Sequence, residues 1–238
     1  MAQRLVFVAL LAIMFAVGAA WAAPSDPFGG DDSGFIPPDT VTQKCEAKVG
    51  KAAAKYVKCV FGCHAQRAKG KLATADAEDG CEDICEGKYD ETVGKATTTV
   101  PPVCPPSCMS PMSIQIIWKG NVDGGNNQVY CEGTTPFGGD DPGFIPSTTT
   151  FALCESKLGG LAAKLVGCLM KCHETRSKEK TDATQEESCE DNCKTSYTNK
   201  FALITGCPPC LTPTSVSSYG DSLRTSTDNN NGLVYCAN

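Results

Sequence analysis

Cys59-Val60-Phe61-Gly62-Cys63 and Cys81-Glu82-Asp83-Ile84-Cys85 are the two C-x3-C pairs that decide the fold of the first half of the chain. Within each pair the two sulfurs lie one helical turn apart, on the same face of a helix. Two antiparallel helices with this spacing can form two disulfides between them. The spacing therefore predicts Cys59–Cys85 and Cys63–Cys81, and the same pattern later in the chain predicts Cys168–Cys193 and Cys172–Cys189.

Apolar residues predict the helices that carry these cysteines. They recur at steps of three and four over 45–63 and 81–93, and again over 154–172 and 189–201. The polar stretches 68–74 and 178–182 are typical of the turn in an antiparallel helical hairpin. Proline-rich segments follow at 97–106 and 206–213, and each half closes with a short tail, expected to be extended. The type of 114–118 and of 212–225 stays open between strand and helix.

An internal repeat organises the chain. Pro27-Phe28-Gly29-Gly30-Asp31-Asp32-Ser33-Gly34-Phe35-Ile36-Pro37 returns 109 positions later, starting at Pro136, with ten of eleven residues identical. Each copy holds eight of the 16 cysteines in one order. We therefore expect two tandem domains, 23–134 and 135–238, each led by an acidic Gly-rich segment that docks on its own hairpin. Each copy is expected to close its own disulfides. The predicted fold class is mainly α, with two tandem disulfide-stapled antiparallel helical hairpins and proline-rich and short extended tails.

The first 22 residues and the composition predict an exported protein. Arg4, an apolar run over 5–17 and the small residues at 20–22 form a secretory signal peptide pattern. An even number of cysteines in an exported chain is typical of a disulfide framework in an oxidising compartment, extracellular or periplasmic. No later apolar stretch is long enough to span a membrane. The net charge of −6 argues against a nucleic-acid partner.

Two resemblances concern the cysteine pattern. The hairpins resemble the twin C-x3-C helical hairpins of plant α-hairpinin defence peptides and of small mitochondrial intermembrane chaperones. The whole repeat resembles one found in tandem in cysteine-rich proteins secreted by environmental bacteria. The matching elements are Gly34-Phe35-Ile36-Pro37, Cys63-His64, Cys207-Pro208-Pro209-Cys210 and the terminal Val-Tyr-Cys. Both resemblances imply a shape, and neither implies an activity.

The two histidines of the chain each directly follow a C-x3-C pair, which gives a haem-c attachment motif lengthened by one residue. The alternative function is therefore an exported dihaem electron carrier. Its haem-binding residues would be Cys59, Cys63, His64, Cys168, Cys172 and His173. Against it, haem at Cys59 and Cys63 would leave Cys81 and Cys85 without disulfide partners. We expect surface histidines beside structural disulfides, and no cofactor.

Three further patterns have structural explanations. Asp31 and Asp32 offer adjacent carboxylates for a weak calcium site, but their spacing is not that of an EF-hand and a solvated linker is expected. Cys207-Pro208-Pro209-Cys210 has thioredoxin-like spacing, which the first copy does not keep. A second alternative function is a protease inhibitor or defence-type hairpin protein, whose loop would present basic residues to a protease. Those residues are Arg67, Lys69, Lys71, Arg176, Lys178 and Lys180.

The sequence predicts a secreted, non-catalytic, disulfide-rich structural or binding module. No catalytic residue and no metal ligand is assigned, because a histidine beside a bridged cysteine has no recognisable orienting carboxylate or serine. The expected partner is an unknown protein or surface ligand. The sequence leaves open the oligomeric state, calcium binding by the leaders, and the pairing of eight cysteines: Cys45, Cys104, Cys108 and Cys131, and Cys154, Cys207, Cys210 and Cys236.

Overall fold

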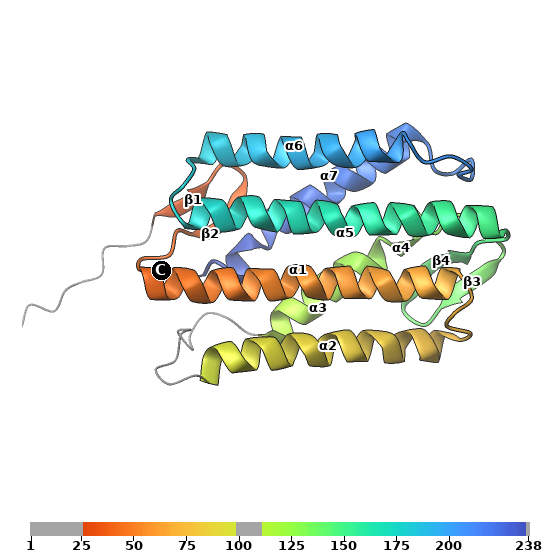
Figure 1. Ribbon diagram of the computed structural model, residues 1–238, viewed down its shortest axis with the longest axis horizontal. Helices are drawn as coiled ribbons and strands as arrows, with labels where there is room; N and C mark the ends of the chain where they lie inside the picture. The colour runs from red at the N-terminus through yellow and green to blue at the C-terminus, as the bar shows by residue number, and fades with distance from the viewer. Residues whose placement is uncertain (1–25, 99–110, 237–238) are drawn as a thin grey trace, which may run out of the picture.

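The computed structural model describes residues 26–98 and 111–236, and these residues are mainly helical, as the sequence predicts (Figure 1). The elements in chain order are β1 (Pro27–Gly29), β2 (Asp32–Phe35), α1 (Thr40–Ala68), α2 (Ala75–Thr98), α3 (Pro111–Gly124), α4 (Asn126–Val129), β3 (Thr135–Gly138), β4 (Asp141–Ile145), α5 (Thr149–Ser177), α6 (Ala183–Phe201), α7 (Pro213–Asn229) and the 3₁₀ turn η1 (Asn231–Leu233). None of the helices in the described ranges is long and apolar enough to cross a membrane.

Side-chain caps fix where the helices begin. Asp39 accepts hydrogen bonds from the backbone N–H of Val41 and Thr42, at 2.7 and 2.9 Å, and so starts α1. Capping boxes start α6 at Asp182 and α7 at Thr212. These contacts satisfy N–H groups that the first helical turn cannot pair within the helix.

Four long helices form one layer, in the order α6, α5, α1, α2, with neighbours antiparallel (Figure 1). Helices α3 and α7 cross behind this layer, and α3 packs on α1 while α7 packs on α5 and α6. The most extensive helix contact is that between α1 and α5, which joins the two halves of the chain. The core lies along these faces and includes Val49, Ala53, Val60, Leu158, Ala162 and Leu169.

Two disulfides cross-link each helical hairpin. The first hairpin, α1 with α2, contains Cys59–Cys85 and Cys63–Cys81. The second, α5 with α6, contains Cys168–Cys193 and Cys172–Cys189. These are the pairs that the helical spacing indicates, and each joins Cα atoms 5.7 to 5.8 Å apart.

The remaining disulfides do not stay within each copy. Cys154–Cys207 lies within the second half, but Cys131–Cys210 joins the end of the first half to the second. The expectation that each copy closes its own bridges is therefore wrong. Cys45 and Cys236 are also disulfide-bonded. Cys104 and Cys108, whose pairing the sequence leaves open, lie outside the described residues.

The acidic Gly-rich leaders form β-hairpins, and each docks on the hairpin of the other half. The β1–β2 leader covers the turn between α5 and α6, where the Phe28 carbonyl accepts two hydrogen bonds from the Arg176 guanidinium. The β3–β4 leader covers the turn between α1 and α2, where Arg67 donates to the Phe137 carbonyl. The expectation that each leader docks on its own hairpin is wrong.

Helix length explains this exchange. The β1–β2 leader enters α1 at its first turn, whereas the turn of its own hairpin lies at the far end of that 29-residue helix, about 43 Å away. Because α5 runs antiparallel to α1, the end of α5 lies beside the start of α1 (Figure 1). The nearest hairpin turn therefore belongs to the other half. In consequence neither 23–134 nor 135–238 contains all of its own stabilising contacts.

The segments whose type the sequence leaves open are helical, namely α3 and α7. The short tails that follow, expected to be extended, also turn back on themselves. Tyr130 N–H donates to the Asn126 carbonyl at 2.8 Å, and Tyr235 N–H donates to the Asn231 carbonyl at 2.9 Å. This compact turn brings each tail tyrosine under a leader, where the Tyr130 ring lies 5.1 Å from that of Phe137.

The disulfide Cys131–Cys210, which joins the two halves of the chain, gives the first prediction. Peptide mapping of the unreduced protein should yield a peptide in which Cys131 is linked to Cys210. The correspondence of the two copies also predicts that the partner of Cys45 is Cys104 and that of Cys236 is Cys108. A digest in which Cys131 and Cys210 are each linked only to cysteines of their own half would contradict the exchanged arrangement.

Candidate metal centre

Both histidines are buried at the end of their helices, and neither is the surface residue that the sequence predicts. His64, near the end of α1, is 1% exposed, and His173, near the end of α5, is 2% exposed. The leaders cover them, since the edge of the Phe137 ring packs on His64 and that of Phe28 on His173, each at 5.9 Å between ring centroids. The exchange of leaders thus removes both imidazoles from solvent.

Four carboxylates surround the Nε2 atom of His64, and we call these five side chains the first centre. Glu82 and Glu78 come from one face of α2, with Oε1 atoms 2.9 and 3.3 Å from Nε2. Asp141, from β4, places Oδ1 at 3.2 Å, and Asp123, from α3, places Oδ1 at 3.4 Å. Each of these side chains is at most 6% exposed.

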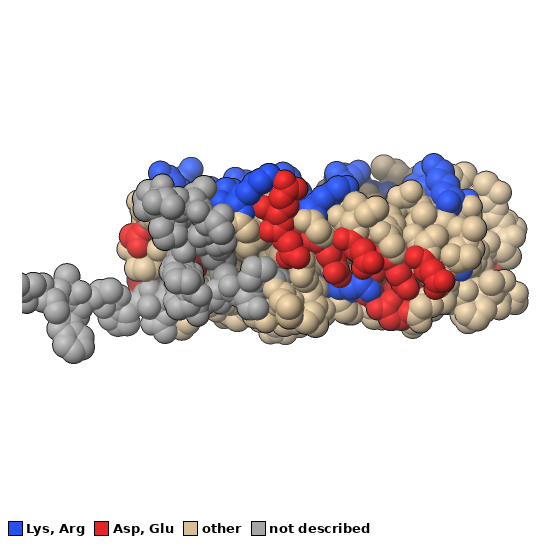
Figure 2. All heavy atoms as spheres, turned by 90° about the horizontal axis from the view of Figure 1, so that it is seen from below, with Lys and Arg blue, Asp and Glu red and all other residues tan. Residues whose placement is uncertain are grey.

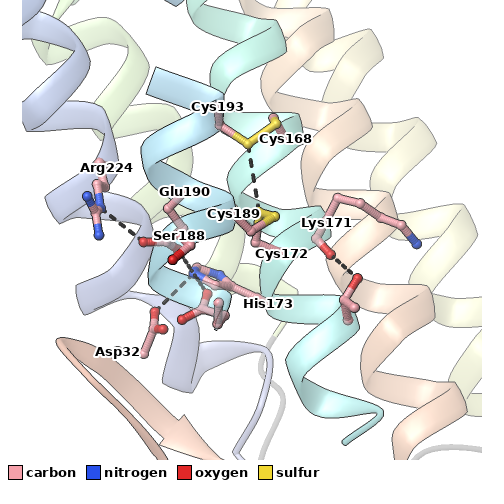
Figure 3. Close-up of a disulfide and its surroundings, with 12 residues drawn as sticks. Asp32, Cys168, Lys171, Cys172, His173, Ser188, Cys189, Glu190, Cys193 and Arg224 are labelled. Carbon is pink, nitrogen blue, oxygen red and sulfur yellow. Dashed lines mark hydrogen bonds and ion pairs between the residues drawn. A yellow bond between two sulfur atoms is a disulfide. The ribbon is translucent and has the colours of Figure 1, made fainter. Parts of the chain in front are cut away.

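The second half builds the same arrangement, and we call it the second centre. Around His173 Nε2 lie Oε1 of Glu190 at 2.7 Å, Oδ1 of Asp32 at 2.9 Å, Oε1 of Glu186 at 3.3 Å and Oδ1 of Asp228 at 3.5 Å. Figure 3 shows Glu190 of α6 and Asp32 of the leader converging on this imidazole, beside the two disulfides of the hairpin. One carboxylate of each centre comes from a leader. Asp141, in the leader of the second half, belongs to the first centre, and Asp32, in the leader of the first half, belongs to the second centre.

Hydrogen bonding does not satisfy these carboxylates. The Nε2 atom of an imidazole carries at most one hydrogen, and the hydrogen-bond geometry pairs it with Glu82 in the first centre and Glu190 in the second. Both carboxylate oxygens of Glu78, Asp141, Glu186 and Asp32 are buried without a hydrogen-bond partner. Burial of unpaired carboxylates is strongly unfavourable, so the arrangement calls for a further cation.

One basic side chain lies on the outer side of each centre. Lys119 Nζ contacts Glu82 Oε2 at 2.8 Å and Asp123 Oδ2 at 3.1 Å, which are the oxygens that face away from His64. In the second centre, Arg224 Nε contacts Glu190 Oε2 at 2.9 Å. This basic side chain offsets one of the four negative charges that each centre would carry with all its carboxylates ionised.

In the metal-free protein these centres hold extra protons. Burial lowers the pKa of His64, but the adjacent carboxylates of Asp123, Asp141 and Glu82 outweigh this effect, and the pKa is well above the usual 6.5. The pKa of His173 is raised in the same way, because Asp228, Asp32 and Glu190 outweigh the effect of burial. Burial, together with the neighbouring leader aspartate, raises the pKa of Glu78 and of Glu186 to about 10. A metal ion would displace such protons when it binds.

The spacing of the ligand atoms fits a metal ion. Neighbouring ligands in an octahedral site with bonds of about 2.1 Å lie about 3.0 Å apart. The distances from the histidine Nε2 atoms to the four surrounding oxygens range from 2.7 to 3.5 Å. Carboxylate oxygens and imidazole nitrogen are together typical ligands of divalent transition metals.

The six residues proposed for haem binding are not arranged for haem attachment, which needs free cysteine thiols. The sulfurs of Cys59, Cys63, Cys168 and Cys172 all form disulfides, so none of them is a thiol that a haem thioether could use. Both histidines point into carboxylate clusters. Cys207 and Cys210, the C-x-x-C pair, bond separately to Cys154 and Cys131 and so staple the fold.

Two other sequence patterns have roles in the fold. Asp32, expected in a solvated linker, has no exposed side-chain surface and belongs to the second centre. Arg67 is bound by the carbonyls of Leu72, Ala73 and Phe137, and Arg176 by those of Thr181 and Phe28. These arginines hold the leaders in place. Lys69, Lys71 and Lys180 are exposed on the turns.

Sequence reasoning missed most of this site. It singled out the two histidines, Asp31 and Asp32, but not the carboxylates of α2, α3, α6 and α7. The missing signal was available in the repeat, because all ten side chains occupy equivalent positions in the two copies. The matched pairs are His64 and His173, Glu78 and Glu186, Glu82 and Glu190, Asp123 and Asp228, and Asp141 and Asp32. No protein-family model, curated protein or solved structure matches the chain.

The raised histidine pKa gives a pH prediction. In metal-free protein, NMR should show that His64 and His173 titrate well above pH 6.5. Because the folded-state pKa lies above 6.5, each charged imidazole stabilises the fold fully below pH 6.5, and this contribution is lost as the pH rises through the elevated value.

The variant Glu82→Gln removes the nearest acceptor of His64 and should lower the pKa of that histidine alone, with His173 as the control within the same molecule. Two histidines that both titrate at or below pH 6.5 would contradict the electrostatics of the centres.

Proposed function

We propose that the protein is a secreted, non-catalytic module that binds one divalent transition-metal ion in each of its two centres. The observation that carries this proposal is a buried group of one imidazole nitrogen and three carboxylate oxygens within 4.8 Å of one another, with a fourth carboxylate beside the imidazole, twice in one chain. The ligand that the sequence leaves open is, in this proposal, a metal ion.

The ligand set favours Mn²⁺ or Fe²⁺. The imidazole nitrogen and the carboxylate oxygens beside it would supply four to five protein ligands to one ion. Water would complete a six-coordinate site. Mn²⁺ and Fe²⁺ accept such six-coordinate sites with mixed oxygen and nitrogen ligands, whereas Zn²⁺ prefers four ligands and Mg²⁺ rarely takes imidazole.

The ions would act as clamps between the halves. The first centre takes its ligands from α1, α2, α3 and β4, and β4 belongs to the leader of the second half. The second centre takes Asp32 from the leader of the first half. An ion in either centre therefore fastens an exchanged leader to the opposite hairpin and adds to the disulfide Cys131–Cys210.

Burial supports a role in binding rather than catalysis. The five side chains of the first centre are at most 6% exposed, which leaves a substrate no surface from which to reach the ion. Export is supported by the six disulfides among the described residues and by the signal-peptide pattern of residues 1–22.

The protein surface also favours a cationic ligand. A diagonal band of Asp and Glu side chains crosses the face that carries α2 (Figure 2). The exposed or half-exposed acidic residues of α2 are Asp76, Asp79, Asp83, Glu86, Asp90 and Glu91. Such a surface raises the local concentration of cations near the first centre.

Metal stoichiometry tests the proposal. Wild-type protein loaded with Mn²⁺ and freed of excess ion should retain two equivalents, measured by elemental analysis and by isothermal titration. His64→Ala should retain one, His173→Ala one, and the double variant none. Loss of a central nitrogen ligand, together with the charge it organises, is expected to weaken binding at that centre at least tenfold.

Neighbouring residues of α2 provide the matched control. Glu82→Gln removes a ligand of the first centre, while Asp83→Asn makes the same chemical change at an exposed position one residue later. The first variant should lose one ion and the second should keep two. Wild-type protein that retains no ion, or retains the same number with and without the histidines, would refute the proposal.

Metal removal should destabilise the fold. An ion at a free concentration one hundred times its dissociation constant stabilises the folded state by about 2.7 kcal/mol per site. For a chain of this size that corresponds to a shift in Tm of about 5 to 10 °C per centre. Thermal unfolding followed by circular dichroism, with and without a chelator, measures this shift. Asp83→Asn should respond as the wild type does, and the double histidine variant should not respond.

A further inference from the structure

The basic residues Lys119 and Arg224 occupy equivalent places, one on the outer side of each centre. Lys119 lies on α3, four residues before Asp123, and Arg224 lies on α7, four residues before Asp228. Their side chains are 22% and 17% exposed, between the buried centre and solvent. Two chemically different cations thus fill one position in the two halves.

The carboxylates divide their oxygens between the centre and the basic residue. Glu82 turns Oε1 toward His64 and Oε2 toward Lys119, and Asp123 divides its two oxygens in the same way. In the second half Glu190 turns Oε1 toward His173 and Oε2 toward Arg224. Carboxylates that divide their oxygens in this way bridge two cations, as they do in two-metal sites with ions about 3.5 to 4 Å apart.

A third carboxylate completes the outer position. Asp140, on the turn of the second leader, places Oδ2 2.8 Å from Lys119 Nζ. Its equivalent Asp31 forms, with Glu190 and Asp228, a group whose carboxylate oxygens lie within 4.8 Å of one another. Three convergent carboxylates around one ammonium or guanidinium are the ligands that a second divalent cation would use.

We infer that Lys119 and Arg224 take the place of a second metal ion and keep each centre mononuclear. This inference rests on the proposed function and adds the nuclearity of the site. The fixed positive charge repels a second divalent ion and occupies its ligands, while the bridging carboxylates stay oriented toward the inner ion.

The experiment removes the basic charge and counts ions. Lys119→Met keeps an unbranched side chain but removes the ammonium group, which frees Glu82, Asp123 and Asp140 to bind a cation. With Mn²⁺ as the probe, this variant should retain three ions where the wild type retains two. Its electron paramagnetic resonance spectrum should gain an exchange-coupled signal from a Mn²⁺ pair. Arg224→Met should do the same in the second half.

Three further variants serve as controls. Lys119→Arg retains the charge and should stay at two ions. Lys51→Met removes an exposed lysine that pairs with Glu174, a residue of neither centre, and should also stay at two. Lys119→Met combined with Asp140→Asn removes one outer ligand and should return the count from three to two. Circular dichroism of each variant checks that the helices are intact.

The outcomes separate this inference from the function on which it rests. A wild type with two ions and a Lys119→Met variant that also holds two uncoupled ions would overturn the inference and leave metal binding in place. A wild type with four ions and coupled spectra would overturn it as well. A wild type that binds no Mn²⁺ would overturn both.

Discussion

Buried negative charge is the constraint on which the rest of the structure depends. Each centre places four carboxylates around one imidazole, and the basic side chain and the protonated imidazole together offset only two of the four charges that ionised carboxylates would carry. Carboxylates removed from water without partners cost several kcal/mol each. Protons reduce this cost in the metal-free protein, as the raised pKa of Glu78 and Glu186 shows. A divalent ion would remove it more completely, and would couple metal binding to folding.

The exchange of leaders follows from the same architecture. Long antiparallel helices place the start of one hairpin beside the turn of the other, so the leader of each half covers the histidine of its partner. Phe28 and Phe137 exclude water from the imidazoles, while Asp32 and Asp141 supply a ligand. Each leader therefore has two roles: its phenylalanine shields an imidazole from water, and the second aspartate of its Gly-Gly-Asp-Asp turn supplies a carboxylate to the centre. Its glycines at 30 and 139 adopt positive φ angles of 65° and 64°, and the tight turn directs the second aspartate inward.

The helical hairpins could be predicted from the local spacing of cysteines. The two centres could not, because their residues come together only through non-local packing. Cysteines four residues apart on one helix face determine which sulfurs can meet, because the partner helix is held in register by the first bridge. The centres instead combine residues from four elements, and their acidic members look like ordinary surface residues along the sequence. Glu78 and Glu82 lie one turn apart on α2, within an otherwise acidic helix. The repeat keeps them as Glu186 and Glu190, but it also keeps the exposed Asp83 as Asp191, so recurrence alone does not single out the buried pair.

An anomalous difference map from crystals of Mn²⁺-loaded protein tests the central claim most directly. The account predicts two strong peaks, each about 2.2 Å from the Nε2 atom of His64 or His173 and surrounded by carboxylate oxygens from both halves of the chain. Peaks confined to the surface, or an imidazole that keeps its hydrogen bond to Glu82 or Glu190 with no ion beside it, would contradict the account.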